Sequence, residues 1–456
     1  MSMSSPPRIL MLVPHEPEAD PRIKWVTQLC AQIGRTDIIG YTSSVDDKPA
    51  REYDGVIYTE RVNPYYYYSF AERLGAGIRR IVRFAYRAVC FCITTLRNDF
   101  HALLGFEHAD DQGCKKTKQG TAMPRIHGRI GSILLFLAVV NSFYRIAQTL
   151  YRRARSVSIC PRVVICHDLY ALIVGVRMKK LSGCFLVYDS HELWPEAFLE
   201  SRKWEKSIIA FVEGWYIKDA DAVITVSPQI ARYLERLYGI DGVITVPNAE
   251  PFAGLEGPRI TTRSSSTIKF LLQGRVVPGR GIEELMDAWS LLDDKRAVLV
   301  VRAPGNDYFS QLCSKYGNAV DGGRIVIAAP VTEDNLVSAA REAEVGIIPY
   351  PGPNLCHIYA CPNKLSQYMQ AGLAILCNAD MEHVSDLVGR FQCGLTYDSS
   401  NPKSLLDAVQ SLIDHPEQLR RMRLNAYNSV RSEFNWDVQA AAYRKIIQQF
   451  YDVGAR

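Results

Sequence analysis

Short apolar runs alternate with amphipathic stretches towards both ends of the chain. Near the start, RILMLV is followed by PRIKWVTQLCAQIG. Later, IKFLLQG is followed by GIEELMDAWSLL and by the apolar runs AVLVVRA, RIVIAA, VGIIPY and AILCN. Apolar runs of this length, separated by stretches of helical periodicity, are typical of parallel strands covered by helices. The pattern predicts an α/β protein with two Rossmann-like, doubly wound domains.

A segment that fits neither periodicity separates the two predicted domains. Residues 247–267 are rich in Pro, Gly, Ser and Thr, a composition typical of linkers. We therefore expect an N-terminal domain over 1–250, a linker over 251–267 and a C-terminal domain over 268–432. Residues 433–456 are expected to form a closing helix, which either packs on its own domain or crosses back to the N-terminal one.

Residues 61–160 depart from the alternation and carry the basic charge of the chain. They hold 16 Lys and Arg against 5 Asp and Glu, whereas the whole chain has a formal charge of +5. Four consecutive tyrosines precede four arginines that are spaced between positions 79 and 87 as on a basic amphipathic helix. Such an insertion suits the surface of an anionic membrane. The alternative is a helical face packed on the first domain, with its arginines solvated.

The composition narrows the class of protein further. At 456 residues, 48% hydrophobic and 22% charged, the chain has an ordinary globular balance. Its twelve cysteines include no CxxC pair, so we expect reduced thiols and no zinc site. The first residues lack the layout of a secretory signal, and no nucleic-acid-binding signature is present. We expect a cytoplasmic protein that associates peripherally with the inner face of a membrane and binds no nucleic acid.

Two segments of the C-terminal domain carry candidate phosphate-binding chemistry. In CPNKLSQYMQAG, Pro362, Asn363 and Lys364 open a predicted helix, so backbone N–H groups and a cation lie where an anion can dock. In FLLQGRVVPGRG, Arg275 and Arg280 flank the turn that follows a strand. Ligands of open α/β sheets bind at the carboxyl ends of the strands. Two guanidinium groups at such a turn indicate a diphosphate.

These two segments, together with VYDSHELWPE, ADAVITVSPQI, TVPN and the late FNW, resemble a GT-B glycosyltransferase of the retaining, family-4-like group. The resemblance spans nearly the whole chain apart from residues 61–160. It implies two Rossmann-like domains facing a central cleft, with a nucleotide-sugar donor on the C-terminal domain and the acceptor on the N-terminal one. It also implies a UDP- or GDP-sugar as the donor, no cofactor and no metal.

The resemblance assigns roles to individual residues. Arg275 and Arg280 match the pair that neutralises the donor diphosphate, and Gly274 belongs to the same turn. His191 matches a histidine beside the transferred sugar, although a histidine at a strand end often only bonds a loop carbonyl. With Arg275 and Arg280, His191 completes the predicted catalytic set. The resemblance places Pro362, Asn363 and Lys364 beside the nucleotide.

The chain departs from the family at two donor-site positions. Retaining relatives often carry two glutamates, the second of which holds the donor ribose, and the matching positions here are Tyr359 and Gln367. Gln367 keeps an acceptor oxygen but no charge. We still expect both residues in the nucleotide site, with weaker binding, altered nucleotide preference or lost activity as the consequences.

Candidate acceptor-side residues lie in PHEPEADPRIKW, after the first predicted strand. His15, Asp20 and Arg22 are expected at the edge of the cleft, although Asp20 before Pro21 is also an ordinary helix N-cap. Asp219-Ala-Asp221 formally matches a DxD metal motif, but it precedes the apolar run AVITV. The family uses these residues structurally, so we expect no catalytic metal.

The predicted reaction is sugar transfer to an acceptor hydroxyl with retention. The basic insertion favours a lipid-linked glycan or cell-surface polysaccharide precursor as the acceptor. Three alternatives stay open. They are a nucleotide-sugar epimerase of the same fold, a non-catalytic glycosyltransferase-like scaffold, and a soluble transferase that acts on a small metabolite.

Overall fold

The computed structural model describes residues 8–17, 20–41, 51–53, 57–62, 146–155, 161–197, 203–258, 267–352 and 354–453. Most of the basic 61–160 segment, including its tyrosine run and clustered arginines, lies outside the described residues. Its helical residues 146–155 pack Leu150 and Ala154 into the core of the N-terminal domain. Within the described chain, no helix is both long enough and apolar enough to cross a bilayer.

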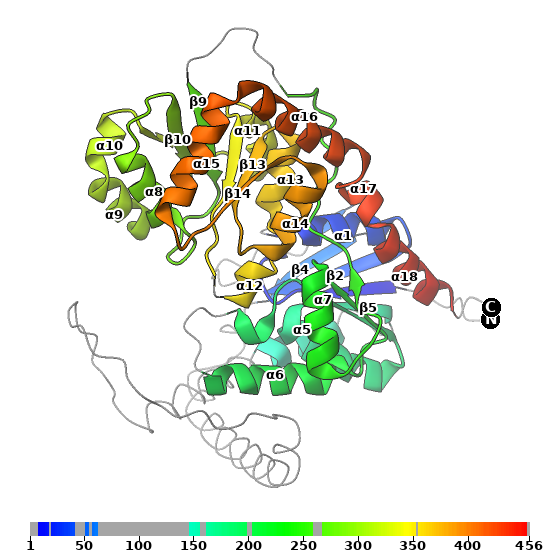
Figure 1. The fold of residues 1–456 in the computed structure, drawn as a ribbon. Coiled ribbons are helices and arrows are strands. Elements are labelled where there is room, and N and C mark those ends of the chain that lie inside the picture. The colour runs from blue at the N-terminus through cyan, green and yellow to red at the C-terminus, as the bar shows by residue number, and fades with distance from the viewer. Residues whose placement is uncertain are drawn as a thin grey trace, which may run out of the picture.

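The N-terminal domain is built on one eight-stranded sheet with the order β3-β4-β2-β1-β5-β6-β7-β8 (Figure 1). Every neighbouring pair is parallel except β3 and β4. The strands are β1 (Arg8–Leu12), β2 (Arg35–Tyr41), β3 (Arg51–Tyr53), β4 (Ile57–Val62), β5 (Pro161–His167), β6 (Phe185–Ser190), β7 (Ala222–Thr225) and β8 (Ile244–Thr245). The helical elements are α1 (Pro21–Ala31), α5 (Asp168–Ser182), the short 3-10 helix η2 (Trp194–Glu196), α6 (Lys203–Ile217) and α7 (Pro228–Tyr238).

The C-terminal domain has a six-stranded, wholly parallel sheet with the order β11-β10-β9-β12-β13-β14. Its strands are β9 (Ile268–Gln273), β10 (Ala297–Arg302), β11 (Ile325–Ala328), β12 (Val345–Ile348), β13 (Ala374–Asn378) and β14 (Gly394–Tyr397). Its helices are α8 (Ile282–Leu291), α9 (Asp307–Lys315), α10 (Gly317–Asp321), the 3-10 turn η3 (Glu333–Asn335), α11 (Leu336–Ala340), α12 (Leu355–Ile358), α13 (Asn363–Gln370), α14 (Glu382–Phe391), α15 (Pro402–Asp414) and α16 (Pro416–Ser432). Two Rossmann-like domains are thus present, as the apolar alternation predicts.

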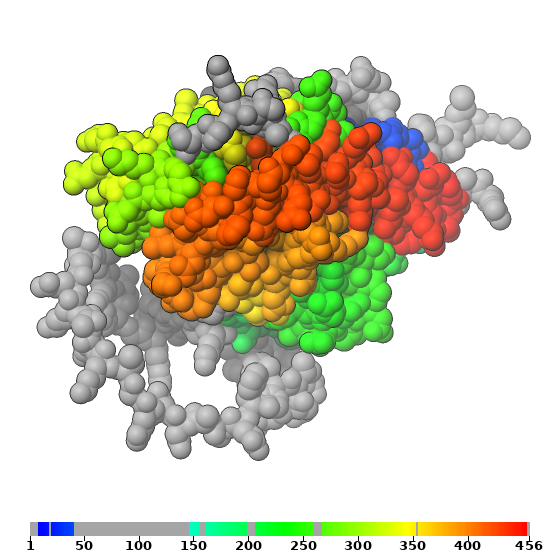
Figure 2. Space-filling view, turned by 45° about the horizontal axis from the view of Figure 1, so that its top comes forward, coloured from blue at the N-terminus to red at the C-terminus, as the bar shows by residue number. Residues whose placement is uncertain are grey.

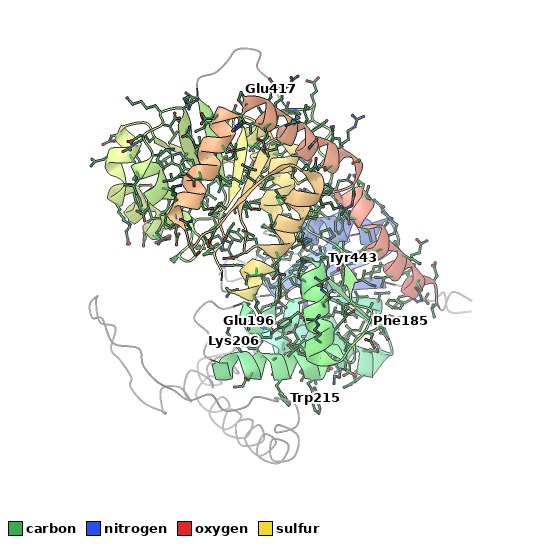
Figure 3. The ribbon with its side chains drawn as sticks, viewed as in Figure 1. Phe185, Glu196, Lys206, Trp215, Glu417 and Tyr443 are labelled. Carbon is green, nitrogen blue, oxygen red and sulfur yellow. The ribbon has the colours of Figure 1, made fainter. Side chains whose placement is uncertain are left out.

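The last helices cross from the C-terminal domain to the N-terminal one. In Figure 2, the chain runs from α16 across the surface to α17 (Trp436–Gln439) and α18 (Ala441–Asp452) beside the start of the chain. Phe450 stacks on Phe185 with ring centroids 4.7 Å apart, and Tyr443 is fully buried in the same core (Figure 3). The apolar stripe of this helix therefore covers one face of the N-terminal sheet.

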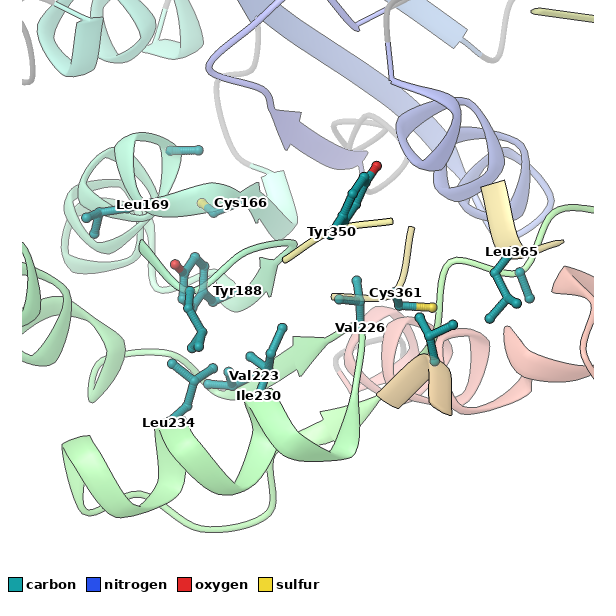
Figure 4. Close-up of a cluster of buried hydrophobic side chains, with 14 of the residues drawn as sticks. Cys166, Leu169, Tyr188, Val223, Val226, Ile230, Leu234, Tyr350, Cys361 and Leu365 are labelled. Atoms are coloured by element: carbon teal, nitrogen blue, oxygen red, sulfur yellow. The ribbon is translucent and has the colours of Figure 1, made fainter. Parts of the chain in front are cut away.

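The segment that leaves the N-terminal domain lies along α13 of the other domain. Asn248 donates through Nδ2 to the Cys361 carbonyl at 3.0 Å, and the Ala253 N–H donates to Gln370 Oε1 at 2.8 Å. A shared apolar cluster lies nearby, in which Tyr350 belongs to the same buried group as residues of β5, β6 and α7 (Figure 4). These contacts join the two domains beside α13, the helix that opens the predicted donor site.

Candidate active site

Two cations converge on a buried tyrosine at the carboxyl end of the C-terminal sheet. Arg280 Nη1 lies 3.4 Å from the hydroxyl oxygen of Tyr350, and Lys364 Nζ lies 6.0 Å from the centre of its ring. Burial raises the pKa of Tyr350, but Lys364 and Arg280 outweigh burial and hold that pKa below its ordinary value. Among the described residues, neither cation has an ion-pair partner, so their charge is available to an anion.

Glycines shape the backbone around these cations. Gly274 directly follows β9 with φ +100°, and a Cβ atom there would lie 2.9 Å from Lys364 Nζ. Gly281 has φ +79°, and a Cβ atom there would lie 2.1 Å from the Pro349 carbonyl oxygen. Both positions favour glycine because of their positive φ, and at Gly281 the Pro349 backbone carbonyl also leaves no room for a Cβ atom.

Three further predicted donor residues lie either at the start of α13 or in the turn that follows β9. Pro362 precedes α13 in an extended conformation, and Asn363 begins the helix. The buried Oδ1 atom of Asn363 has no hydrogen-bond partner among the described residues. Arg275 is exposed and bonds no described residue. The structure thus places Gly274, Arg280 and Lys364 together, with Arg275 on the exposed side of the turn.

A second charged cluster lies at the carboxyl ends of β5 and β6 in the N-terminal domain. His191 Nδ1 lies 3.3 Å from Asp20 Oδ2, and His191 Nε2 lies 3.4 Å from Asp189 Oδ2. Asp168 accepts the His191 backbone N–H at 3.1 Å and the Trp194 indole N–H at 3.2 Å. Asp168 holds φ +65°, an uncommon conformation for a residue other than glycine.

The carboxylates of this cluster set the charge of the imidazole. Burial lowers the pKa of His191, but Asp168, Asp189 and Asp20 raise it well above its ordinary value. Burial lowers the pKa of His167, which lies 3.2 Å from His191 between the two nearest ring nitrogens. The three carboxylates therefore favour the imidazolium form of His191, whereas burial favours the neutral imidazole form of His167.

Two of the three predicted acceptor-side residues lie at the edge of this cluster, and the third lies beneath it. Asp20 caps α1 by accepting the Arg22 N–H at 2.9 Å, while its other oxygen faces His191 and His15. The side chain of His15 is 37% exposed. Arg22 is 1% exposed and donates to both oxygens of Asp189, at 2.8 and 3.1 Å. Arg22 therefore neutralises Asp189 inside the protein.

The two clusters belong to domains that touch beside them. Cys356 Sγ lies 3.1 Å from the Leu193 carbonyl, and Asn354 donates to the Glu196 carbonyl at 3.1 Å. Burial and Asp168 raise the pKa of Glu192, while Arg280 of the other domain lowers it. The charge of Arg280 thus acts across the domain contact on the loop that carries His191.

The positions of the two missing glutamates lie in different surroundings. The Tyr359 carbonyl accepts a hydrogen bond from the Ser227 hydroxyl at 2.7 Å. Tyr359 also lines a cavity of about 510 Å³ together with residues of α7 and α14. Gln367 is 5% exposed and donates through Nε2 to Glu250 Oε1 at 2.7 Å. Gln367 therefore keeps a carboxylate beside it, although that carboxylate comes from another segment.

The two sets of possible metal ligands have other partners. Asp221 accepts from Lys179 Nζ at 2.7 Å and from the Leu186 N–H at 2.8 Å, and Asp219 pairs with Lys180 at 2.9 Å. His167, Asp189 and His191 bring their ligand atoms within 4.8 Å of one another. The bidentate Arg22 guanidinium already neutralises the carboxylate of that trio, so a cation there would compete with an existing ion pair.

Two known sequence families match the chain. Residues 107–249 match the family described as Glycosyltransferase Family 4, and residues 258–429 match Glycosyl transferases group 1. The chain is a GT-B glycosyltransferase. The first match begins inside the basic 61–160 segment.

One curated relative of this glycosyltransferase is an uncharacterized glycosyltransferase of Methanocaldococcus jannaschii, 22% identical over 245 residues. The match spans 51% of this chain and 59% of the length of that relative.

Solved structures share the fold over nearly the whole chain. The sucrose-phosphate synthase of Thermosynechococcus elongatus has a TM-score of 0.65 at 16% identity and covers 99% of this chain and 100% of its own. An α,α-trehalose 6-phosphate synthase of Burkholderia multivorans has a TM-score of 0.61 at 12% identity, covering 99% and 98%. Anabaena HepE in complex with UDP has a TM-score of 0.55 at 12% identity, covering 97% of each chain.

Several residues of the site were missed by the sequence analysis. Tyr350 sits in an apolar run and reads as a strand end, while Asp168 and Asp189 read as ordinary polar residues after strands. The repeated pattern of a buried strand followed by His-Asp or Asp-Ser-His could have indicated them, because parallel neighbours end at the same edge of a sheet. Nothing local in the sequence connects Glu250 with Gln367, 117 positions later.

Proposed function

We propose that this glycosyltransferase moves a sugar from a UDP- or GDP-sugar to an acceptor hydroxyl with retention of the anomeric configuration. The observation that carries the proposal is the pair of unneutralised cations, Arg280 and Lys364, at the carboxyl end of the C-terminal sheet. A diphosphate suits this place because two fixed cations and the start of α13 can share its charge.

The N-terminal domain carries negative charge that would stabilise the positive character of the sugar ring during transfer. When the bond from the anomeric carbon to the diphosphate breaks, negative charge collects on the phosphate and positive character on the ring. Around His191, three carboxylates face two cations, so the cluster keeps an excess negative charge. Fixed charges of opposite sign on the two domains favour this separation more in the transition state than in the ground state.

We also propose that the nucleotide is UDP or GDP and that transfer requires no metal ion. UDP is present in the structure of Anabaena HepE and in that of TarM from S. aureus, which have the same fold. Because cationic side chains are available for the diphosphate, we expect transfer to persist in EDTA. The proton NMR spectrum of the product tests retention, since an inverted anomeric configuration would contradict it.

The acceptor is proposed to be a lipid-linked glycan or a cell-surface polysaccharide precursor at an anionic membrane. The support is the excess of basic residues in segment 61–160 and their spacing among aromatic residues. Reversing the charge of the four arginines between positions 79 and 87 should weaken binding to anionic liposomes and leave binding to neutral liposomes unchanged. Undiminished binding to the anionic liposomes would contradict membrane docking.

One experiment tests the proposal against its alternatives. The purified protein is incubated with UDP-, GDP- and ADP-sugars, with and without a membrane lipid extract, and nucleotide release is measured. Release that depends on lipid supports the proposal, and release with a small soluble acceptor indicates a metabolite transferase. Conversion of the donor sugar without release indicates an epimerase. The absence of any turnover, together with the lost carboxylates at Tyr359 and Gln367, favours a scaffold.

A further inference from the structure

Glu250, at the end of the N-terminal domain, is a carboxylate that forms no ion pair with any described residue. Its Oε1 atom accepts from Gln367 Nε2 at 2.7 Å, and the charge that acts on its pKa is the negative carboxylate of Glu333. Burial raises the pKa of Glu250 to about 7. A half-buried carboxylate that lacks a counter-charge destabilises a fold unless a ligand uses it, so such a group is a candidate for function.

A chain of hydrogen bonds fixes the direction in which Gln367 faces this carboxylate. Arg302 can only donate, so Gln273 Oε1 must be the acceptor of its bond at 3.2 Å. Gln273 Nε2 then donates to the Leu336 carbonyl at 3.3 Å and to Gln367 Oε1 at 3.4 Å. Gln367 Nε2 is therefore left to donate to Glu250. The amide of Gln367 thus orients the carboxylate.

The backbone of Glu250 is held in place from two sides. Its N–H donates to the Ser366 hydroxyl at 2.9 Å, and its carbonyl accepts the Trp436 N–H at 3.1 Å. The second carboxylate oxygen, Oε2, has no partner among the described residues and is not sealed from solvent. Glu250 therefore presents one fixed and open acceptor from the segment that lies along α13.

The spacing along α13 relates this acceptor to the phosphate site. Gln367 lies four residues after Asn363, and four residues of an α-helix advance about 6 Å along its axis. In a nucleoside diphosphate, the ribose diol is separated from the phosphates by the sugar ring and C5′, a similar span. With the diphosphate at Arg280 and Lys364, the diol falls beside Gln367 and Glu250. A carboxylate is a suitable acceptor for two neighbouring hydroxyl groups.

We propose that Glu250 binds the ribose diol of the nucleotide and supplies the carboxylate that Gln367 and Tyr359 lack. This proposal rests on the proposed nucleotide-sugar donor. Glu250 selects ribonucleotides over nucleotides that have no ribose hydroxyls, and Gln367 acts as the positioning residue that holds its carboxylate. In this chain, the carboxylate that family members carry on α13 at position 367 is thus replaced by the carboxylate of Glu250 on the adjoining segment.

The test measures nucleotide binding by calorimetry, so it does not depend on knowing the sugar or the acceptor. UDP and GDP are compared with their 2′,3′-dideoxy forms for the unsubstituted protein, for Glu250→Gln and for the control Glu256→Gln. Glu256 lies in the same segment, is exposed and carries the same charge. Glu250→Gln should weaken binding of the ribonucleotide about 10- to 100-fold and leave the dideoxy form nearly unaffected.

A second variant protects the test against a merely structural effect. In Glu250→Gln/Gln367→Glu, the carboxylate returns to α13, and the preference for ribose should recover. An unchanged ribose preference in Glu250→Gln would overturn this inference while leaving the proposed function intact. If the unsubstituted protein binds neither UDP nor GDP, both the inference and the proposed donor are wrong.

Discussion

Glu213 offers a test of the fold beneath the active site. It lies on α6, is 0% exposed, and accepts hydrogen bonds from the hydroxyl groups of Tyr188 and Tyr238 at 2.6 Å each. Tyr188 immediately precedes Asp189 of the His191 cluster. Burial raises the pKa of Glu213 from 4.5 to about 7, against the two tyrosine bonds that lower it. The folded state therefore holds the proton of Glu213 more tightly than the unfolded state does.

The sign of the pH dependence follows from this direction. The stability that comes from the protonated form of Glu213 is fully present below pH 4.5 and is lost as the pH rises through about 7. A shift of this size corresponds to about 3 kcal/mol in the free energy of unfolding. Glu213→Gln keeps the shape and a neutral amide for both tyrosines, so it should remove this loss.

The assay compares urea unfolding of the two proteins between pH 4.5 and pH 8.5 by circular dichroism. The difference between the free energies of unfolding, Glu213→Gln minus the unsubstituted protein, should increase by about 3 kcal/mol from pH 4.5 to pH 8.5. Taking the difference between the two proteins cancels the titration of every other group. Parallel curves would show that Glu213 titrates alike in both states and would refute the reasoning.

Two further predictions concern the backbone and the charge of the site. Gly281→Ala should destabilise the protein by about 1–3 kcal/mol and lower its melting temperature, because φ is +79° and the added Cβ meets the Pro349 carbonyl. Gly305→Ala, where no atom lies within 4 Å of the new Cβ, is the control, and equal melting temperatures would count against this reading. Asp168→Asn, which suits the positive φ, should lower the pKa of His191 measured by NMR titration. An unchanged pKa of His191 in Asp168→Asn would show that Asp168 does not stabilise the protonated form of His191.

The strands and the donor helix could be predicted from the sequence because they depend on local patterns. Apolar runs such as AILCN form strands in which every residue is buried. The Pro-Asn-Lys sequence that begins α13 is likewise a signal of neighbouring residues. Arg280 and Lys364 could be paired from sequence because strand ends of a parallel sheet share one edge.

Other features depend on contacts that no local pattern contains. The acceptor-side expectation for Arg22 rested on its position after Asp20, yet its guanidinium reaches Asp189, 167 residues away. The partnership of Glu250 with Gln367 arises only because the linker lies along α13. The choice for the last helix between its own domain and the N-terminal one was decided by packing of Phe450 on Phe185, which periodicity alone does not specify.

The most direct test of the central claim is sugar transfer by Arg280→Ala from the UDP- or GDP-sugar that the unsubstituted protein uses. Arg390→Ala is the matched control, because Arg390 is an exposed arginine that pairs with Glu433 on the outer surface. Removing a fixed cation from the leaving diphosphate should lower kcat about 100- to 1000-fold, with the control unchanged. Transfer by Arg280→Ala at the unsubstituted rate would contradict the assignment of this site.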